Sequence, residues 1–115
     1  MAKKIHIIKK KIDFIKIHKY GKFSSSNNFS IKKLYDKNLN DNYKFGYKVT
    51  KKLGNAVKRN KAKRIMRELT KRNILKLKRK NFFYVFSAKK GLFNTPFKEL
   101  EKEFRELVIK KWTRF

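Results

Sequence analysis

The chain has 115 residues, and 35 lysines and arginines against 8 aspartates and glutamates give it a formal net charge of +27. This length suits one domain, residues 1–115, because two separate cores would each bury too little apolar surface. Apolar residues make up 40% and aromatic residues 15%, which exceeds the content of a disordered basic tail. The absence of cysteine excludes disulfides, thiolate metal sites and cysteine nucleophiles, and it suits the cytoplasm. The charge excess predicts a polyanionic partner.

The first quarter of the chain predicts a basic arm, a helix and a loop. Residues 1–9 mix lysines with isoleucines without a turn residue, so we expect a mobile basic arm. Apolar side chains recur at helical spacing over residues 10–20, and Gly21 can end that helix. The serines and asparagines at 24–28 predict a loop.

Two strands are expected near residues 29–32 and 45–50, joined by a polar turn at 36–42, and their spacing favours a hairpin. Asp36 and Asp41 are interpreted as turn formers. Period-2 alternation predicts that one face is core and the other basic. The expected core set is Phe29, Ile31, Phe45, Tyr47 and Val49, and the opposite set is Ser30, Lys32, Lys48 and Thr50.

The second half predicts a basic helix, a buried strand and a final helix. Asn55 can cap a helix with an apolar stripe and a largely cationic remainder. Residues 82–86 are apolar at both parities, as in a strand covered on both faces. Thr95 and Pro96 can begin the last helix. Because residues 99–115 are nearly charge-balanced, the polyanion site is expected elsewhere.

The most informative stretch runs from Lys51 to Arg64. It carries two lysines into a glycine turn, then a helix cap, and then at least five cations with Asn60 among them. The unpaired amides at a helix N-terminus and the helix dipole both attract phosphate. An asparagine also offers an acceptor for a ribose or a base edge.

This stretch resembles the hallmark of the bacterial ribonuclease P protein subunit, which runs Lys-Lys-x-Gly-Asn-Ala-Val-x-Arg-Asn-(Arg or Lys)-x-Lys-Arg. Every fixed position is matched from Lys51 to Arg64. Asp13, Phe14, Gly21, Gly46 and the aromatic strand at 82–86 also lie at family-like spacing. The resemblance covers roughly residues 10–110.

The resemblance implies an α/β (α+β) two-layer sandwich. In that family a four-stranded sheet packs with three helices in the order α-β-β-β-α-β-α. The basic helix would lie in a left-handed β-α-β crossover, an exception to the usual right-handed rule.

The resemblance also implies an RNA-binding subunit of a ribonucleoprotein endonuclease. The associated ribonuclease P RNA would hold Mg²⁺ and remove the 5′ leader from precursor tRNA, while the protein, a monomer when free, binds both RNAs. No catalytic residue, metal ligand or cofactor is therefore expected on the protein. The residue inventory agrees, because the acids are few and His6 and His18 are the only histidines.

Two sets of site residues follow from the resemblance. The set expected to face the catalytic RNA is Lys52, Asn55, Arg59, Asn60, Lys61, Lys63, Arg64 and Arg67. The set expected to line a cleft for the precursor leader is Phe14, His18, Lys32 and Lys48, where Lys48 is added because strand parity places it on the same sheet face as Lys32. The family has aromatic residues where this chain has His18 and Lys32, which predicts weaker base preference and stronger salt dependence. Tyr35 would supply a ring if the register of its strand differs.

Three other classes of protein compete with this interpretation. A small basic ribosomal protein with a structural role is the main alternative. An architectural DNA-binding protein would need a groove-reading element that the sequence does not offer. An autonomous nuclease would need an acidic cluster that the composition disfavours.

Overall fold

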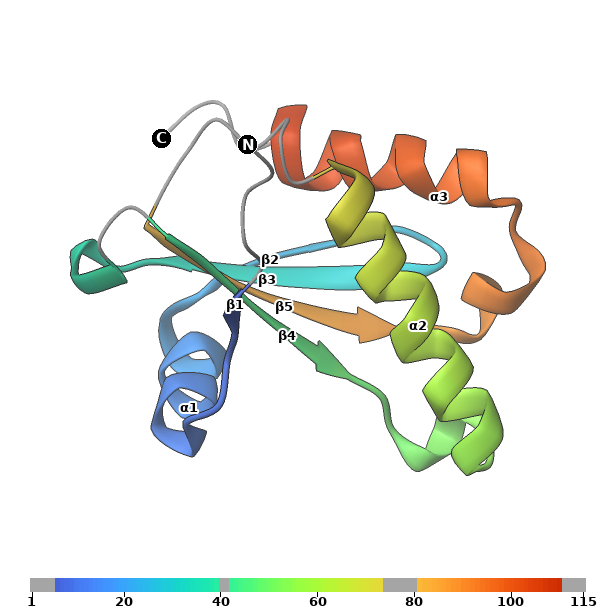
Figure 1. The fold of residues 1–115 in the computed structure, drawn as a ribbon, viewed down its shortest axis with the longest axis horizontal. Coiled ribbons are helices and arrows are strands. Elements are labelled where there is room, and N and C mark those ends of the chain that lie inside the picture. Colours follow the sequence, from blue (N-terminus) through green and yellow to red (C-terminus); the bar gives the residue numbers. More distant parts are fainter. Residues whose placement is uncertain (1–5, 40–41, 74–80, 111–115) are drawn as a thin grey trace.

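The computed structural model describes residues 6–39, 42–73 and 81–110, which form one mixed sheet with helices packed on it (Figure 1). The elements in chain order are β1 (His6–Ile7), α1 (Lys11–Tyr20), β2 (Lys22–Ser25), β3 (Phe29–Tyr35), β4 (Tyr43–Lys48), α2 (Ala56–Asn73), β5 (Phe82–Ala88) and α3 (Phe97–Phe104). Short 3-10 turns occur at Lys37–Leu39, Lys51–Leu53 and Lys90–Asn94, and a π-helical segment, Arg105–Lys110, continues α3. The strand order across the sheet is β1-β4-β5-β3-β2.

Strand β5 lies at the centre of the sheet and is buried on both faces. Its side chains alternate, so Phe82, Tyr84 and Phe86 enter one core while Phe83 and Val85 enter another. This confirms the prediction of a strand covered on both sides, which followed from its apolar residues at both parities.

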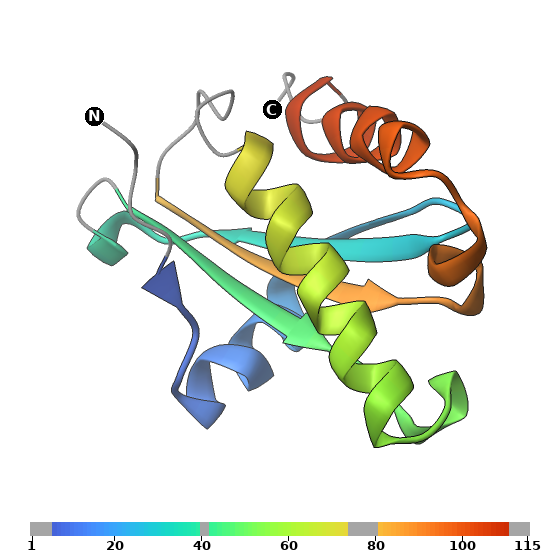
Figure 2. The same ribbon diagram turned by 45° about the vertical axis from the view of Figure 1, so that its right-hand side comes forward.

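The helices cover opposite faces of the sheet, with α2 and α3 on one side and α1 on the other (Figure 2). The larger core lies under α2 and α3, which contribute Met66, Leu69 and Phe104. The smaller core lies under α1 and includes Ile17, with Phe14 packed against it. The α/β class and the three helices are confirmed, but the sheet lies between helical layers rather than beneath one.

The predicted hairpin between the strands near 29–32 and 45–50 is wrong. Strand β5 lies between them, antiparallel to β3 and parallel to β4. Because β5 is paired with a strand on each side, its apolar run does not form an exposed edge of the sheet. The parallel β4-α2-β5 crossover agrees with the family pattern, whose left-handed sense stays a prediction.

The hairpin of this structure joins β2 to β3, where a loop at 24–28 was expected. Strand β2 pairs with β3 from Lys22↔Lys33 to Ser25↔Ser30. Serine-rich composition concealed this short edge strand, because serine is also common in turns.

The N-terminal arm, expected to be mobile over residues 1–9, is ordered in its second half. His6–Ile7 pair with β4 in parallel and make the sheet five-stranded rather than four-stranded. Ile8 is buried, and its backbone N–H donates to the Phe45 carbonyl at 2.9 Å. An apolar side chain and an unpaired strand edge together account for this docking. Residues 1–5 lie outside the described residues.

The predicted end of α1 is confirmed, whereas the predicted start of α3 differs by one residue. Gly21 ends α1 as expected, with its N–H donating to the Ile17 carbonyl at 2.8 Å. At α3, Pro96 rather than Thr95 holds the N-cap position. The Thr95 hydroxyl instead contacts the Gly91 carbonyl and Asn28 Oδ1, at 2.9 and 3.0 Å. Thr95 therefore joins the start of α3 to the β2–β3 hairpin.

An ion pair holds α1 to the end of β3. Lys16 Nζ lies 2.7 Å from Asp36 Oδ2, and Asp36 Oδ1 accepts the Asn38 N–H at 2.9 Å. The hydrogen bond from Lys16 and that from the Asn38 amide lower the pKa of Asp36 below its ordinary value of 3.8. The turn role predicted for Asp36 is confirmed, while Asp41 lies outside the described residues.

Asp36→Asn should lower stability modestly at neutral pH, by no more than about 1 kcal/mol, because Lys16 is partly solvated. A carboxylate with a depressed folded pKa stabilises the fold above its unfolded pKa and loses that effect as pH falls through the folded value. The gap between wild type and variant, measured by urea unfolding, should therefore hold from pH 7 to about 5 and close below the ordinary pKa of 3.8. A gap that widens toward acid would refute this assignment.

Candidate nucleic-acid interface

A cleft of about 630 Å³ lies between α1 and the sheet. All four residues predicted for the leader cleft, Phe14, His18, Lys32 and Lys48, line it together. The full lining is Lys11, Phe14, Ile15, Ile17, His18, Phe23, Ser30, Lys32, Tyr47, Lys48, Val85 and Ser87.

One face of α1 forms the helical wall of the cleft. Lys11, Phe14, Ile15 and His18 follow the i, i+3, i+4, i+7 spacing that places side chains on one side of a helix. Ile15 and His18 are exposed, whereas Phe14 is half-buried. The wall thus presents apolar and aromatic surface with a lysine at the start of the helix.

Phe14 packs directly on Gly46 of β4. A Cβ at Gly46 would lie 2.7 Å from Phe14 Cε1 and 2.9 Å from Cζ, which is too close for any side chain. The absence of a side chain at residue 46 therefore lets the ring rest on the strand backbone. Phe14 packs against the smaller core and also lines the cleft.

The floor of the cleft is a row of directly paired residues across four strands. Phe23 pairs with Lys32, Lys32 with Val85, and Val85 with Gly46. Directly opposed residues point to the same face of a sheet. The row therefore runs from Phe23 at the β2 edge to Gly46, where Phe14 rests.

Lys32 bridges the floor and the helical wall. Its Nζ donates to the His18 backbone carbonyl at 2.7 Å. That carbonyl belongs to the last turn of α1, where carbonyls lack helical partners and the helix dipole favours a cation. The ammonium keeps two further N–H donors.

Tyr35 does not belong to the cleft, so the alternative register for β3 is wrong. Its position shares parity with Phe29 and Ile31, which enter the larger core on the opposite face. The Tyr35 ring packs edge-on against Phe82, at 5.5 Å between centroids.

The sequence reasoning missed Phe23, Lys11 and Ile15, which also line the cleft. The helical spacing from Phe14 and His18 was sufficient to find the two α1 residues. Phe23 was missed because the residues after Gly21 were not expected to form a strand.

The basic helix begins at a turn that requires glycine. Gly54 has φ +140°, a conformation that other residues rarely adopt, and the Lys58 side chain packs over it. Asn55 Oδ1 accepts the Lys58 N–H at 3.0 Å, which confirms the predicted cap. Lys52 lies exposed in the preceding turn.

The residues predicted to face the catalytic RNA surround the solvent side of α2. Met66 and Leu69 bury the opposite side, as the predicted apolar stripe requires, although Val57 of that stripe is 75% exposed. Arg59 is half-buried, and its Nε is buried without a hydrogen-bond partner among the described groups. Exposed members of the predicted set are Lys52, Asn55, Asn60, Lys61, Arg64 and Arg67, and Lys63 is half-buried.

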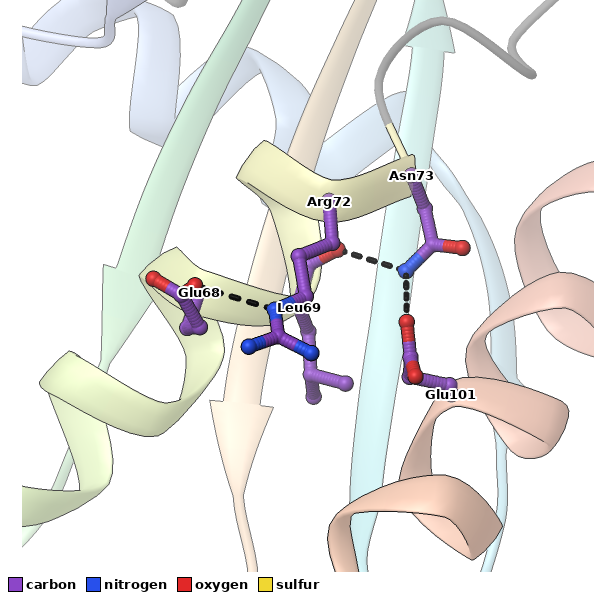
Figure 3. A network of polar contacts seen from close by, with 5 residues as sticks. All are labelled: Glu68, Leu69, Arg72, Asn73 and Glu101. Atoms are coloured by element: carbon purple, nitrogen blue, oxygen red, sulfur yellow. Dashed lines mark hydrogen bonds and ion pairs between the residues drawn. The ribbon is translucent and has the colours of Figure 1, made fainter.

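The two ends of α2 differ in electrostatic surroundings. At the C-terminal end, Arg72 Nε pairs with Glu68 at 3.0 Å, and Asn73 Nδ2 donates to Leu69 O and Glu101 Oε2 (Figure 3). In the described part of the chain, none of the cations from Lys58 to Arg67 lies within 4.0 Å of a carboxylate. The first half of α2 is therefore an unneutralised cationic surface.

The described ranges contain neither a membrane-spanning helix nor a metal-binding cluster. Within them, no helix combines the length and apolarity needed to cross a bilayer. Over the same ranges, no three histidine, cysteine, aspartate or glutamate side chains gather as a metal site.

The fold and the site define a class of protein: a small α/β domain with a cationic helix on one face of its sheet and a lysine-rimmed aromatic cleft on the other, as suits a polyanion binder. The family model "Ribonuclease P" matches residues 1–112. The ribonuclease P protein component of Mesoplasma florum is 35% identical over 104 residues, which cover 90% of this chain and 93% of the relative. That of Clostridioides difficile is 33% identical over 101 residues, covering 88% and 87%.

Solved structures agree with the sequence relatives. The Staphylococcus aureus RNase P protein superposes with a TM-score of 0.79 at 28% identity, over 95% of this chain and 97% of that one. The Thermotoga maritima RNase P protein gives 0.75 at 27% identity, over 85% and 90%. The chain belongs to the ribonuclease P protein family, the protein components of a tRNA-processing ribonucleoprotein endoribonuclease.

Gly46→Ala should destabilise the fold by about 1–3 kcal/mol, because the new methyl group overlaps the Phe14 ring. In a Phe14→Ala background, the same substitution should cost much less, since the nearest clashing atoms are absent. Urea unfolding of the two single variants and the double variant measures this coupling. Equal costs in both backgrounds would show that Gly46 is not constrained by Phe14.

Proposed function

We propose that this chain binds the ribonuclease P RNA through the exposed first half of α2 and holds the 5′ leader of precursor tRNA in the cleft beside α1. The observation that carries the proposal is the convergence of Phe14, His18, Lys32 and Lys48 on one cleft. These four positions lie on three different elements, α1, β3 and β4. Nothing in their sequence spacing requires such convergence.

The cleft chemistry suits a single-stranded nucleic acid. Aromatic rings stack on unpaired bases at about 1–3 kcal/mol per base, while lysines follow the backbone phosphates. Phe14 supplies such a ring, and Lys11, Lys32 and Lys48 supply the cations. Because Lys32 replaces a family aromatic residue, phosphate contacts carry more of the leader affinity here.

The surface of α2 suits a folded RNA whose phosphates lie close together. Its cations have no carboxylate partner among the described residues, so RNA phosphates compete with no internal acid there. Binding then releases counterions from the RNA and weakens steeply as salt rises. Residues 56–58 in the first turn of α2 are exposed, and backbone amides at a helix N-terminus can donate to phosphate.

The proposal assigns the bond-breaking chemistry, and the Mg²⁺ that assists it, to the RNA subunit. The protein's part is to bind and orient the two RNAs, with no resident cofactor. It would be a monomer when free, because a net charge of +27 opposes self-association. A cytoplasmic location fits the cysteine-free composition.

Reconstitution with the ribonuclease P RNA of the same cell tests this function. The protein should lower the Mg²⁺ concentration needed to cleave a precursor tRNA that carries its leader, whereas the protein alone should cleave nothing. A small basic ribosomal protein of the same organism serves as the control for nonspecific charge. An equal effect from that control, or cleavage by the protein without RNA, would refute the proposal.

Variants of the two surfaces should separate two binding steps. Phe14→Ala should weaken the holoenzyme's binding of leader-bearing precursor about tenfold and leave leaderless tRNA almost unchanged, because only the leader reaches the ring. Arg59→Gln with Arg64→Gln should weaken assembly with the catalytic RNA and reduce its salt slope by about 2. Equilibrium binding at several salt concentrations measures both. If Phe14→Ala affected both substrates equally, the cleft assignment would be wrong.

A further inference from the structure

Phe23 is the most exposed aromatic residue of the cleft, with 63% of its surface accessible. It lies on the edge strand β2 and pairs directly with Lys32 of β3. Its ring forms none of the aromatic or cation–π pairs found among the described residues. A large apolar ring held open to solvent beside lysines is suited to contact with a charged and partly aromatic ligand.

Resting on the function proposed above, we propose that Phe23 is a second stacking platform, which contacts a leader nucleotide different from the one that contacts Phe14. The other phenylalanine and tyrosine rings that line the cleft, Phe14 and Tyr47, are both half-buried, so Phe23 is the ring most open to a ligand. Phe23 places an aromatic side chain on the cleft floor, on the neighbouring strand β2 directly opposite Lys32.

The sheet register separates the two rings. Phe23 and Gly46 stand at opposite ends of the paired row, with Lys32 and Val85 between them. Three inter-strand steps of about 4.8 Å place the two ends roughly 14 Å apart. Phe14 rests on Gly46, so the two rings lie toward opposite ends of the cleft floor, where they can contact different nucleotides of a single strand.

The charge between the rings identifies the occupant. Lys32 lies in the row next to Phe23, and its ammonium retains two donors beyond its bond to the His18 carbonyl. Lys48 lies in the adjacent row, where it pairs with Ser87, and Ser87 pairs with Ser30. The two rows therefore bring a ring, two cations and serine hydroxyls to one floor, a combination that suits the bases and phosphates of a single strand.

The test uses the reconstituted holoenzyme and two substrates, a precursor tRNA with its leader and the same tRNA without it. Phe23→Ala should weaken binding of the leader-bearing substrate about five- to tenfold, the low end of the stacking energy of one base, and leave the leaderless substrate unchanged. Phe23→Trp should retain the affinity. Tyr35→Ala is the matched control, because Tyr35 is an exposed aromatic residue of the same sheet on the opposite face, and it should change neither affinity.

A series of precursors, each with one abasic leader nucleotide, locates the contact. One abasic position should weaken wild-type binding about fivefold and have no further effect on Phe23→Ala. That position should differ from the position coupled to Phe14→Ala, and the two alanine substitutions should be additive, as expected for rings this far apart.

Four outcomes would overturn the inference: no loss with Phe23→Ala, equal losses on both substrates, a tryptophan variant as weak as the alanine variant, or no abasic position coupled to Phe23. Failure of the function proposed above is distinguishable, because wild type and Phe14→Ala would then fail to separate the two substrates. A leader-dependent Phe14→Ala with a silent Phe23→Ala rejects only the role of Phe23.

Discussion

The burial of β5 on both of its faces is the constraint on which the rest of this molecule depends. A strand with apolar side chains at both parities must be covered twice, and here α2 and α3 cover one face while α1 covers the other. The two cationic surfaces therefore face away from each other across one sheet. A hairpin fold with a single covered face would have left no separate wall for the cleft.

Like-charge repulsion explains where the cations lie. Glu68 and Glu101 lie at the C-terminal end of α2, where helix packs against helix and Arg72 and Asn73 need partners. The first half of α2 carries its cations at the solvent face, where water and counterions screen them. The C-terminal end of α2 thus has acidic partners, while the cations of its first half remain on a surface open to a polyanion.

Apolar periodicity predicted the helices and the faces of β3 and β4, whereas the shared cleft was predicted from the family resemblance and from the parity of Lys32 and Lys48. The sequence did not predict strand pairing, since β3 and β4 both satisfy an alternating pattern whichever neighbour they take. It also missed β1 and β2, which are two and four residues long and polar or basic in part. Edge strands of this kind form because an adjacent strand offers unpaired backbone groups, a property of the assembled sheet rather than of the segment itself.

A short connection joins β4, which ends at the cleft, to the cationic helix α2. Lys48 ends β4 at the cleft, and α2 begins at Ala56, only eight residues later. The glycine conformation at residue 54 and the Asn55 cap define the path of that connection. On the proposed function, the distance between the two bound RNAs is a constant of the protein, so the chain acts as a molecular spacer that sets where the leader emerges relative to the catalytic RNA.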